Sequence, residues 1–148
     1  MLARDIATRR VIQAEVTQSL REAACSMYRH QVSCLVVTSS QGQAKIPVGM
    51  LSIRDVATAV LLEGKDPDTV AIAGIMSRPP VVAREDCTLA ELIAILRGSG
   101  VRRLPVVDAA GGLVGIVSAD DMIAAMAELM EDLARALIVD PQLDHAVR

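Results

Sequence analysis

Aromatic residues are nearly absent from this 148-residue chain, which contains one tyrosine, no phenylalanine and no tryptophan. Proteins that bind single-stranded nucleic acid stack its bases on aromatic side chains, and nucleic-acid-binding domains generally present a basic face. Here the formal net charge is −3, and the lysines and arginines are scattered along the chain. We therefore expect no nucleic-acid partner, and we expect any flat ligand ring to lie between aliphatic side chains.

Long apolar runs are also missing, since none approaches the roughly 20 residues of a membrane-spanning helix. The first residues lack the apolar segment of a secretory signal. The three cysteines are an odd number without close spacing, which favours reduced thiols over a disulfide framework. These absences predict a cytoplasmic protein that does not enter the membrane.

No set of residues typical of catalysis or metal binding is visible. His30 and His145 lie far apart in the sequence, and neither adjoins a nucleophile motif. No cysteine and histidine cluster has the spacing of metal ligands. We therefore expect neither a metal site nor an enzyme.

An internal repeat fills most of the chain. The stretches GMLSIRDV at 49–56 and GIVSADDM at 115–122 share a glycine, a serine and an aspartate at the same spacing. A shift of 69 residues aligns the segments before them, and the shift drops to 66 after a turn that is three residues longer in the first copy. Loops tolerate such differences in length. We predict a first repeat at 1–66, a linker and second repeat at 67–138, and a tail at 139–148.

Each repeat predicts the same order of elements, β-α-β-β-α. Extended segments at 11–14 and 81–83 lead to helices that begin after Ser19 and Thr88, each followed three residues later by a glutamate, as in a capping box. Two apolar strands around a polar turn and a second helix follow. Because a repeat of about 60 residues buries little surface alone, we expect the two sheets to pack together.

The last helix is predicted to be longer than its counterpart in the first repeat. Apolar residues at helical spacing continue from Met122 to about Ile138, where Asp140 and Pro141 end the pattern. One interpretation is a helix packed on its own core. The excess length favours a partner surface, most simply a second copy of the chain, and we predict a homodimer.

The repeated Ser-x-x-Asp phrase allows two interpretations. Ser52 with Asp55, and Ser118 with Asp121, stand where a strand turns into a helix, and such pairs cap helices. However, Asp is shorter than Glu and is expected to reach the cap amide less well. A glycine inside a strand also often marks close approach by a backbone or a ligand. The second interpretation is a ligand site, in which the carboxylate accepts ribose hydroxyls and the helix N–H groups attract an anion.

The second repeat adds two adjacent arginines, Arg102 and Arg103, in the stretch GVRRLPVVD. Arginine forks suit phosphate, although a solvated strand edge would also hold them. The matching positions in the first repeat are Ser33 and Cys34. We therefore expect two clefts, if both exist, to differ in charge.

The paired repeats resemble cystathionine-β-synthase (CBS) domains, and two in tandem resemble a Bateman module. The similarity is carried by the duplicated Gly-x-x-Ser-x-x-Asp phrase, by RRLPVVD and by IMSRPPVV. It implies an α/β (α+β) fold in which two β-α-β-β-α repeats form a pseudo-two-fold pair, here with an extended C-terminal helix. It also implies regulatory binding of AMP, ADP, ATP or S-adenosylmethionine in clefts between the repeats, energy sensing included, with output to a separate effector protein.

The resemblance further implies which residues contact the nucleotide. They are Ser118, Asp121, Arg102, Arg103, Val81, Val82, Ile116, Ser52, Asp55, Met50, Ile12 and Gln13. The first repeat departs from the pattern, because it lacks the basic pair and carries Ala7 where the second repeat has Met76. The alternative function is a structural dimerisation or scaffold module with empty or vestigial clefts.

Overall fold

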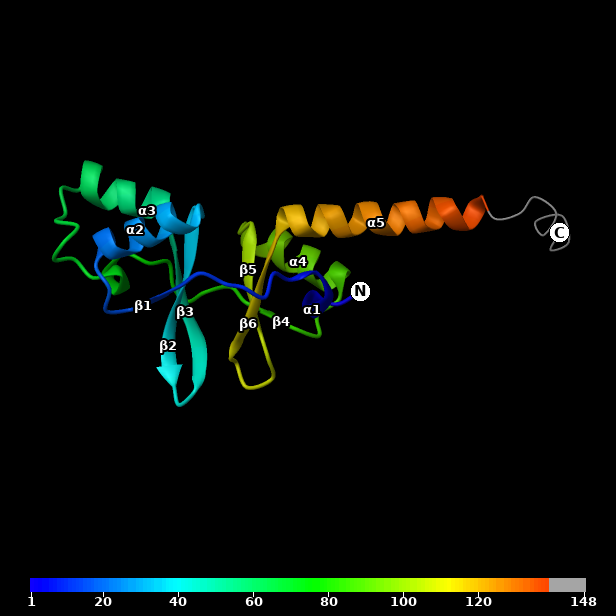
Figure 1. The fold of residues 1–148 in the computed structure, drawn as a ribbon, viewed down its shortest axis with the longest axis horizontal. Helices are drawn as coiled ribbons and strands as arrows, with labels where there is room; N and C mark the ends of the chain where they lie inside the picture. The colour runs from blue at the N-terminus through cyan, green and yellow to red at the C-terminus, as the bar shows by residue number, and fades with distance from the viewer. Residues whose placement is uncertain (139–148) are drawn as a thin grey trace, which may run out of the picture.

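The computed structural model describes residues 1–138, which form two three-stranded sheets with helices packed against each (Figure 1). The first half contains α1 (Ala3–Ile6), β1 (Gln13–Glu15), α2 (Leu20–His30), β2 (Cys34–Gln41), β3 (Ala44–Ser52), α3 (Ile53–Ala57) and the π-helix η1 (Thr58–Leu62). The second half contains the 3₁₀-helix η2 (Ile72–Gly74), β4 (Ala83–Arg84), α4 (Leu89–Ser99), β5 (Arg103–Val107), β6 (Leu113–Ser118) and α5 (Ala119–Leu137).

The predicted α+β fold and the order of elements in each repeat are confirmed. Two local differences stand out. The leading strands begin at Gln13 and Ala83, two residues later than predicted, and the short helix α1 was not predicted. The predicted tail at 139–148 lies outside the described residues.

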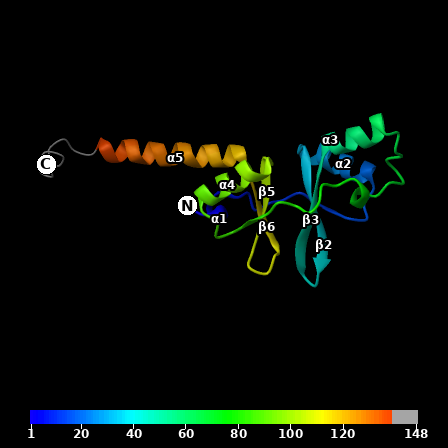
Figure 2. The same ribbon diagram turned by 180° about the vertical axis from the view of Figure 1, so that it is seen from behind.

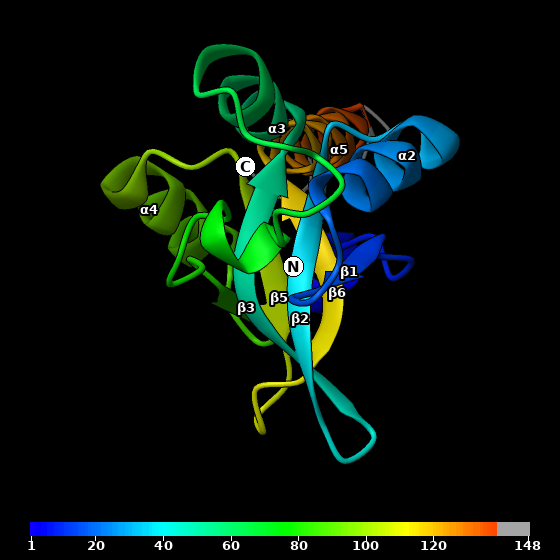
Figure 3. The ribbon, with the colours of Figure 1, turned by 90° about the vertical axis from the view of Figure 1, so that its left-hand side faces the viewer.

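The two sheets have the same topology and nearly the same register. In each, a parallel leading strand is followed by an antiparallel hairpin, in the orders β1-β2-β3 and β4-β5-β6. Cys34 pairs with Ser52 in the first sheet, and Arg103 pairs with Ser118 at the equivalent place in the second. Figure 3 shows the sheets one behind the other, with the longer β2–β3 hairpin projecting past them.

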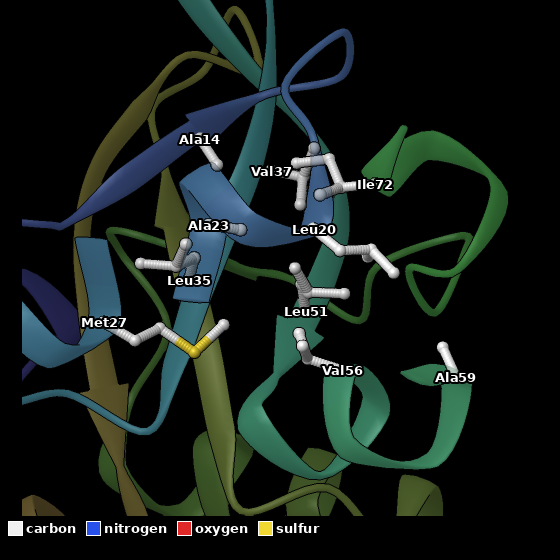
Figure 4. Packing of buried hydrophobic residues seen from close by; sticks show 10 residues of the cluster. All are labelled: Ala14, Leu20, Ala23, Met27, Leu35, Val37, Leu51, Val56, Ala59 and Ile72. Atoms are coloured by element: carbon white, nitrogen blue, oxygen red, sulfur yellow. The ribbon is translucent and has the colours of Figure 1, made fainter. Parts of the chain in front are cut away.

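Each hydrophobic core contains residues from the other half of the chain. Ile72 is fully buried in the first core, where it lies beside Leu20 and Val37 (Figure 4). Conversely, Ala3 is fully buried in the second core, and Ile6 packs against it. The segment that precedes each repeat therefore crosses to the other one, so that neither core is complete without both halves. The boundary at 66/67 stays a prediction.

The crossing segments explain the repeated glycine. Thr8 and Ile116 exchange two backbone hydrogen bonds, with N···O distances of 2.9 and 3.0 Å, and Ser77 and Met50 do the same at 2.9 and 3.0 Å. A Cβ built on Gly115 would lie 3.1 Å from the carbonyl oxygen of Thr8. The glycine thus leaves room for another backbone, which is the first of the two causes that its position in the strand suggested.

Replacement of Gly115 by alanine is expected to lower the free energy of unfolding by about 1–3 kcal/mol, because the added methyl group must displace the crossing segment. Urea titration of the variant measures the change. Gly98→Ala is the control, since a Cβ there meets nothing within 4 Å. It lies inside α4, where alanine favours the helix by about 0.5–1 kcal/mol. Equal stability of the Gly115 variant and the native chain would contradict the packing argument.

Helix α5 extends well beyond the sheet that it starts from (Figure 1 and Figure 2). Met122, in its first turn, is buried, whereas Leu133 is 63% and Leu137 78% exposed. The predicted length of this helix is confirmed, but its apolar face covers the chain's own core only at the beginning. Nowhere in 1–138 is a helix both long enough and apolar enough to cross a membrane.

Candidate ligand site: two clefts between the repeats

The first cleft, of about 430 Å³, lies where the first crossing segment meets the second sheet. Its lining includes the duplicated corner of the second repeat, Ser118 and Asp121, together with Ile116. The opposite wall comes from the first repeat and includes Ile12 and Cys34. The remaining lining residues are Thr8, Arg10, Val11, Gln31, Val32, Ser33 and Arg103. We call this the Asp121 cleft.

The second cleft, of about 270 Å³, has the reverse composition. Its corner is Ser52 and Asp55 of the first repeat, with Met50 beside them, and the crossing segment that closes it belongs to the second repeat. The remaining lining residues are Cys34, Ser77, Pro79, Pro80, Val81, Val101, Arg102 and Arg103. We call this the Asp55 cleft. The two clefts are thus related by the same exchange that builds the two cores.

The serine–aspartate pairs form complete capping boxes. The backbone N–H of Ser118 donates to Asp121 Oδ2 at 2.8 Å, and the N–H of Asp121 donates to Ser118 Oγ at 3.1 Å. Ser52 and Asp55 repeat these bonds with the same distances. The expectation that aspartate is too short to reach the cap amide is wrong, because the extended backbone of the serine brings its N–H close to the carboxylate.

Among the two caps predicted with glutamate, only one is complete. Thr88 and Glu91 exchange both bonds, at 2.8 and 3.2 Å. At the other, the N–H of Glu22 donates to Ser19 Oγ, but the glutamate accepts from the serine hydroxyl rather than from its amide. Capping is therefore part of what Asp55 and Asp121 do. It occupies Oδ2 only, and within residues 1–138 Oδ1 of each has no hydrogen-bond donor, so capping and ligand binding are compatible.

Both clefts carry the same formal charge on their linings. The Asp55 cleft has Arg102 and Arg103, and the Asp121 cleft has Arg103 and Arg10, each beside one aspartate. The expectation that the clefts differ in charge is therefore wrong, because Arg103 reaches both and Arg10 comes from the crossing segment. None of these three arginines forms a salt bridge within the part of the chain that the structure describes.

Cys34 and Arg103 lie at equivalent positions of the two repeats, and both line both clefts. Burial raises the pKa of the Cys34 thiol, and the neighbouring guanidinium of Arg103 acts in the opposite direction through its charge and a hydrogen bond. The net upward direction means that Cys34 is a neutral thiol at neutral pH. It therefore adds no negative charge to compete with a ligand for Arg103.

Most residues implied for the site do line a cleft. Those that line neither are Gln13 and Val82. Gln13 lies in β1, where its Oε1 accepts a hydrogen bond from Thr38 at 3.3 Å, and Val82 is 37% exposed. Sequence reasoning missed Arg10. The repeat aligns Arg10 with Pro79, so the comparison of the two copies does not indicate a basic residue at this position. Sequence reasoning also missed Thr8 and Ser77, although both carry a hydroxyl at the same repeat position.

A larger hollow, of about 710 Å³, lies elsewhere, between α2 and α3. Its lining is mostly aliphatic, with Leu20, Val56 and Val60 on the inside and Leu61 at the exposed side. It lacks both serine–aspartate corners and any carboxylate, so size alone does not make it a nucleotide site. No three His, Cys, Asp or Glu side chains within 1–138 are grouped so as to hold a metal ion.

Two mixed clefts, formed by repeats that exchange their leading segments, define a tandem-repeat module. The chain belongs to the CBS domain family, whose model matches residues 3–62 and 72–128. The solved structures to which it is similar are those of CBS domain proteins, including isolated CBS domain pairs. The resemblance in the sequence is thereby confirmed.

Relatives share this arrangement over most of the described chain. An uncharacterised protein of Methanopyrus kandleri, MK0525, is 34% identical over 80% of this chain, which spans 59% of that protein's length. The CBS domain-containing protein YhcV of Bacillus subtilis is 33% identical over 80% of this chain and 81% of its own. The crystal structure of the CBS domain pair of protein MJ0100, in complex with 5′-methylthioadenosine and S-adenosyl-L-methionine, superposes with a TM-score of 0.73. It is 26% identical, and the match covers 86% of this chain and 97% of that one.

Proposed function

We propose that this protein is a regulatory module that binds an adenosine-containing ligand, AMP, ADP, ATP or S-adenosylmethionine, between its two repeats. One observation carries the proposal. Each cleft contains a carboxylate whose Oδ2 is fixed by the cap while Oδ1 has no donor within residues 1–138. A fixed carboxylate oxygen in a half-buried corner is suited to accept hydrogen bonds from the two hydroxyls of a ribose.

The other groups of such a ligand also have partners in the Asp121 cleft. Ile12 and Ile116 supply the aliphatic walls that a purine ring needs in a chain almost without aromatic residues. Arg10 and Arg103 supply the charge that a phosphate needs. The ligands of the MJ0100 pair have adenine and a ribose with both ring hydroxyls in common, which supports recognition of the base and the sugar and leaves the group on the 5′ carbon to distinguish one ligand from another.

The volumes of the two clefts indicate which of them fits a nucleotide better. Small-molecule sites generally measure about 300–1,000 Å³. The Asp121 cleft, at about 430 Å³, falls within this range, whereas the Asp55 cleft, at about 270 Å³, falls just below it. We therefore assign the tighter binding of a nucleotide to the Asp121 cleft. The Asp55 cleft then fills second.

The output of the module is proposed to be a change in packing between the repeats or between two copies of the chain. The crossing segments support this, because they form part of both clefts and both cores. The exposed apolar face of α5 supports a homodimer. The three free cysteines and the nucleotide ligands suit the cytoplasm, where a separate effector protein would receive the signal.

Isothermal titration calorimetry with AMP, ATP, S-adenosylmethionine and 5′-methylthioadenosine tests the proposal. We expect saturable binding of at least one of them, at one or two ligands per chain, and a matching rise in melting temperature. Guanosine monophosphate serves as the control for the base, since it keeps the ribose and the phosphate. The absence of binding by all four adenosine ligands would instead favour a structural dimerisation module with vestigial clefts.

A further inference from the structure

Arg103 is the one charged side chain within residues 1–138 that lines both clefts. Arg103 is the first residue of β5 and pairs with Ser118 of one corner. It also lies beside Cys34, and Cys34 pairs with Ser52 of the other corner. Its side chain is exposed and forms no salt bridge in this part of the chain. One guanidinium is therefore available to two sites.

The arginines cannot satisfy two phosphates equally. Arg10 lines the Asp121 cleft alone and Arg102 the Asp55 cleft alone. Each cleft therefore has two arginines, but one of them, Arg103, is shared. A phosphate bound in one cleft takes the bidentate fork of Arg103, because a guanidinium offers its best geometry to one anion at a time. The second phosphate then meets a single arginine and a neighbouring negative charge.

We propose that Arg103 couples the two clefts negatively for phosphate-bearing ligands and leaves them independent for uncharged nucleosides. The proposal rests on the proposed function, because it concerns the same two clefts. The charge of the ligand thereby decides how many molecules bind: a nucleoside fills both clefts, whereas a nucleoside monophosphate fills one cleft well before the other. The loss of one charge-assisted interaction predicts a second binding step weakened about 10- to 100-fold.

The clefts differ in size, so unequal affinities alone do not demonstrate coupling. Asp121→Asn and Asp55→Asn each weaken one cleft and thereby report the intrinsic affinity of the other for AMP. If the clefts were independent, the AMP isotherm of the native protein would equal the sum of these two single-cleft isotherms. We expect instead that the second molecule of AMP binds about tenfold or more weakly than that sum predicts. For adenosine, we expect the native isotherm to equal the sum of the isotherms of the two variants.

Three arginine variants locate the coupling. Arg103→Gln is expected to weaken the first AMP step and to remove the difference between measured and summed isotherms. Arg10→Gln and Arg102→Gln are the matched controls, and each is expected to weaken AMP binding in its own cleft only. Native AMP isotherms that equal the sum, or an Arg103 variant that weakens one cleft alone, would overturn the coupling while the proposed function stands. Failure of AMP to bind would also overturn the coupling, whereas the proposed function itself falls only if ATP, S-adenosylmethionine and 5′-methylthioadenosine fail to bind as well.

Discussion

Asp121→Asn is expected to weaken adenosine binding in the Asp121 cleft by about 10- to 100-fold, with a change of less than about 1 kcal/mol in the free energy of unfolding. The asparagine keeps one side-chain oxygen that can accept from the N–H of Ser118, so the cap survives. It replaces the second carboxylate oxygen by an amide NH₂, which cannot accept hydrogen bonds from the ribose hydroxyls. The loss of hydrogen bonds to a charged group costs about 1.5–3 kcal/mol, which corresponds to this range.

Calorimetric titration with adenosine measures the affinity, and urea unfolding without ligand measures the stability. Glu91→Gln is the matched control, because Glu91 has the same capping role at α4 but lines neither cleft. It is expected to leave adenosine affinity unchanged. Asp121→Ala should lose both ligand affinity and about 1 kcal/mol of stability, since it removes the carboxylate that accepts from the N–H of Ser118 and leaves only the bond to Ser118 Oγ. An asparagine variant that binds like the native protein would assign Asp121 to capping alone.

The order of the elements could be predicted because each signal is local. Thr88 and Glu91 mark the beginning of α4 by the chemistry of the cap, and the length of α5 follows from apolar spacing that continues to its end. The repeat doubled this information, since each element of the β-α-β-β-α order was indicated twice. The late beginning of β1 could not be predicted in this way. Thr8 pairs with the opposite sheet, and only from Gln13 does the segment pair with β2.

The exchange of leading segments between the two repeats could not be predicted from the sequence for a related reason. Ile6 and Ile75 occupy the same repeat position, yet each packs into the core of the other repeat. Hydrophobic spacing shows that a residue is buried without showing in which of two similar cores. The composition of the clefts depends on this exchange, and so the partners of each aspartate could not be assigned from the sequence. Arg10 enters the Asp121 cleft only because its segment crosses over.

The corner residues themselves could be found, because they are repeated. From the sequence alone, capping and ligand binding are alternative explanations of Asp55 and Asp121. The geometry removes the competition, since one carboxylate has two oxygens and the cap uses only Oδ2. The cap also holds each carboxylate in one orientation, which would lower the entropic cost of the proposed binding. The duplicated phrase thus places a preoriented carboxylate at each of two equivalent corners.

Leu133→Glu is expected to convert a homodimer into monomers, raising the dimer dissociation constant by about a thousandfold or more. Leu133 is 63% exposed and lies on one face of α5 with Met126, Met130 and Leu137, all of which are at least 45% exposed. Within residues 1–138 nothing covers this apolar face, whereas a second copy would cover it. A charge buried there without a partner costs several kcal/mol, and two-fold symmetry applies the cost twice in each dimer.

Sedimentation equilibrium over a range of protein concentrations measures the dissociation constant. The matched control is Ala124→Glu, which introduces the same charge on the opposite side of α5, at a position that is also exposed. It is expected to leave the dimer intact, because a new charge in water has little cost. Both variants should unfold cooperatively, as folded proteins do, and bind adenosine, since neither residue lines a cleft. If the native protein sediments as a monomer, or if both variants dimerise equally, the apolar face of α5 is not the contact between copies, which would overturn the prediction.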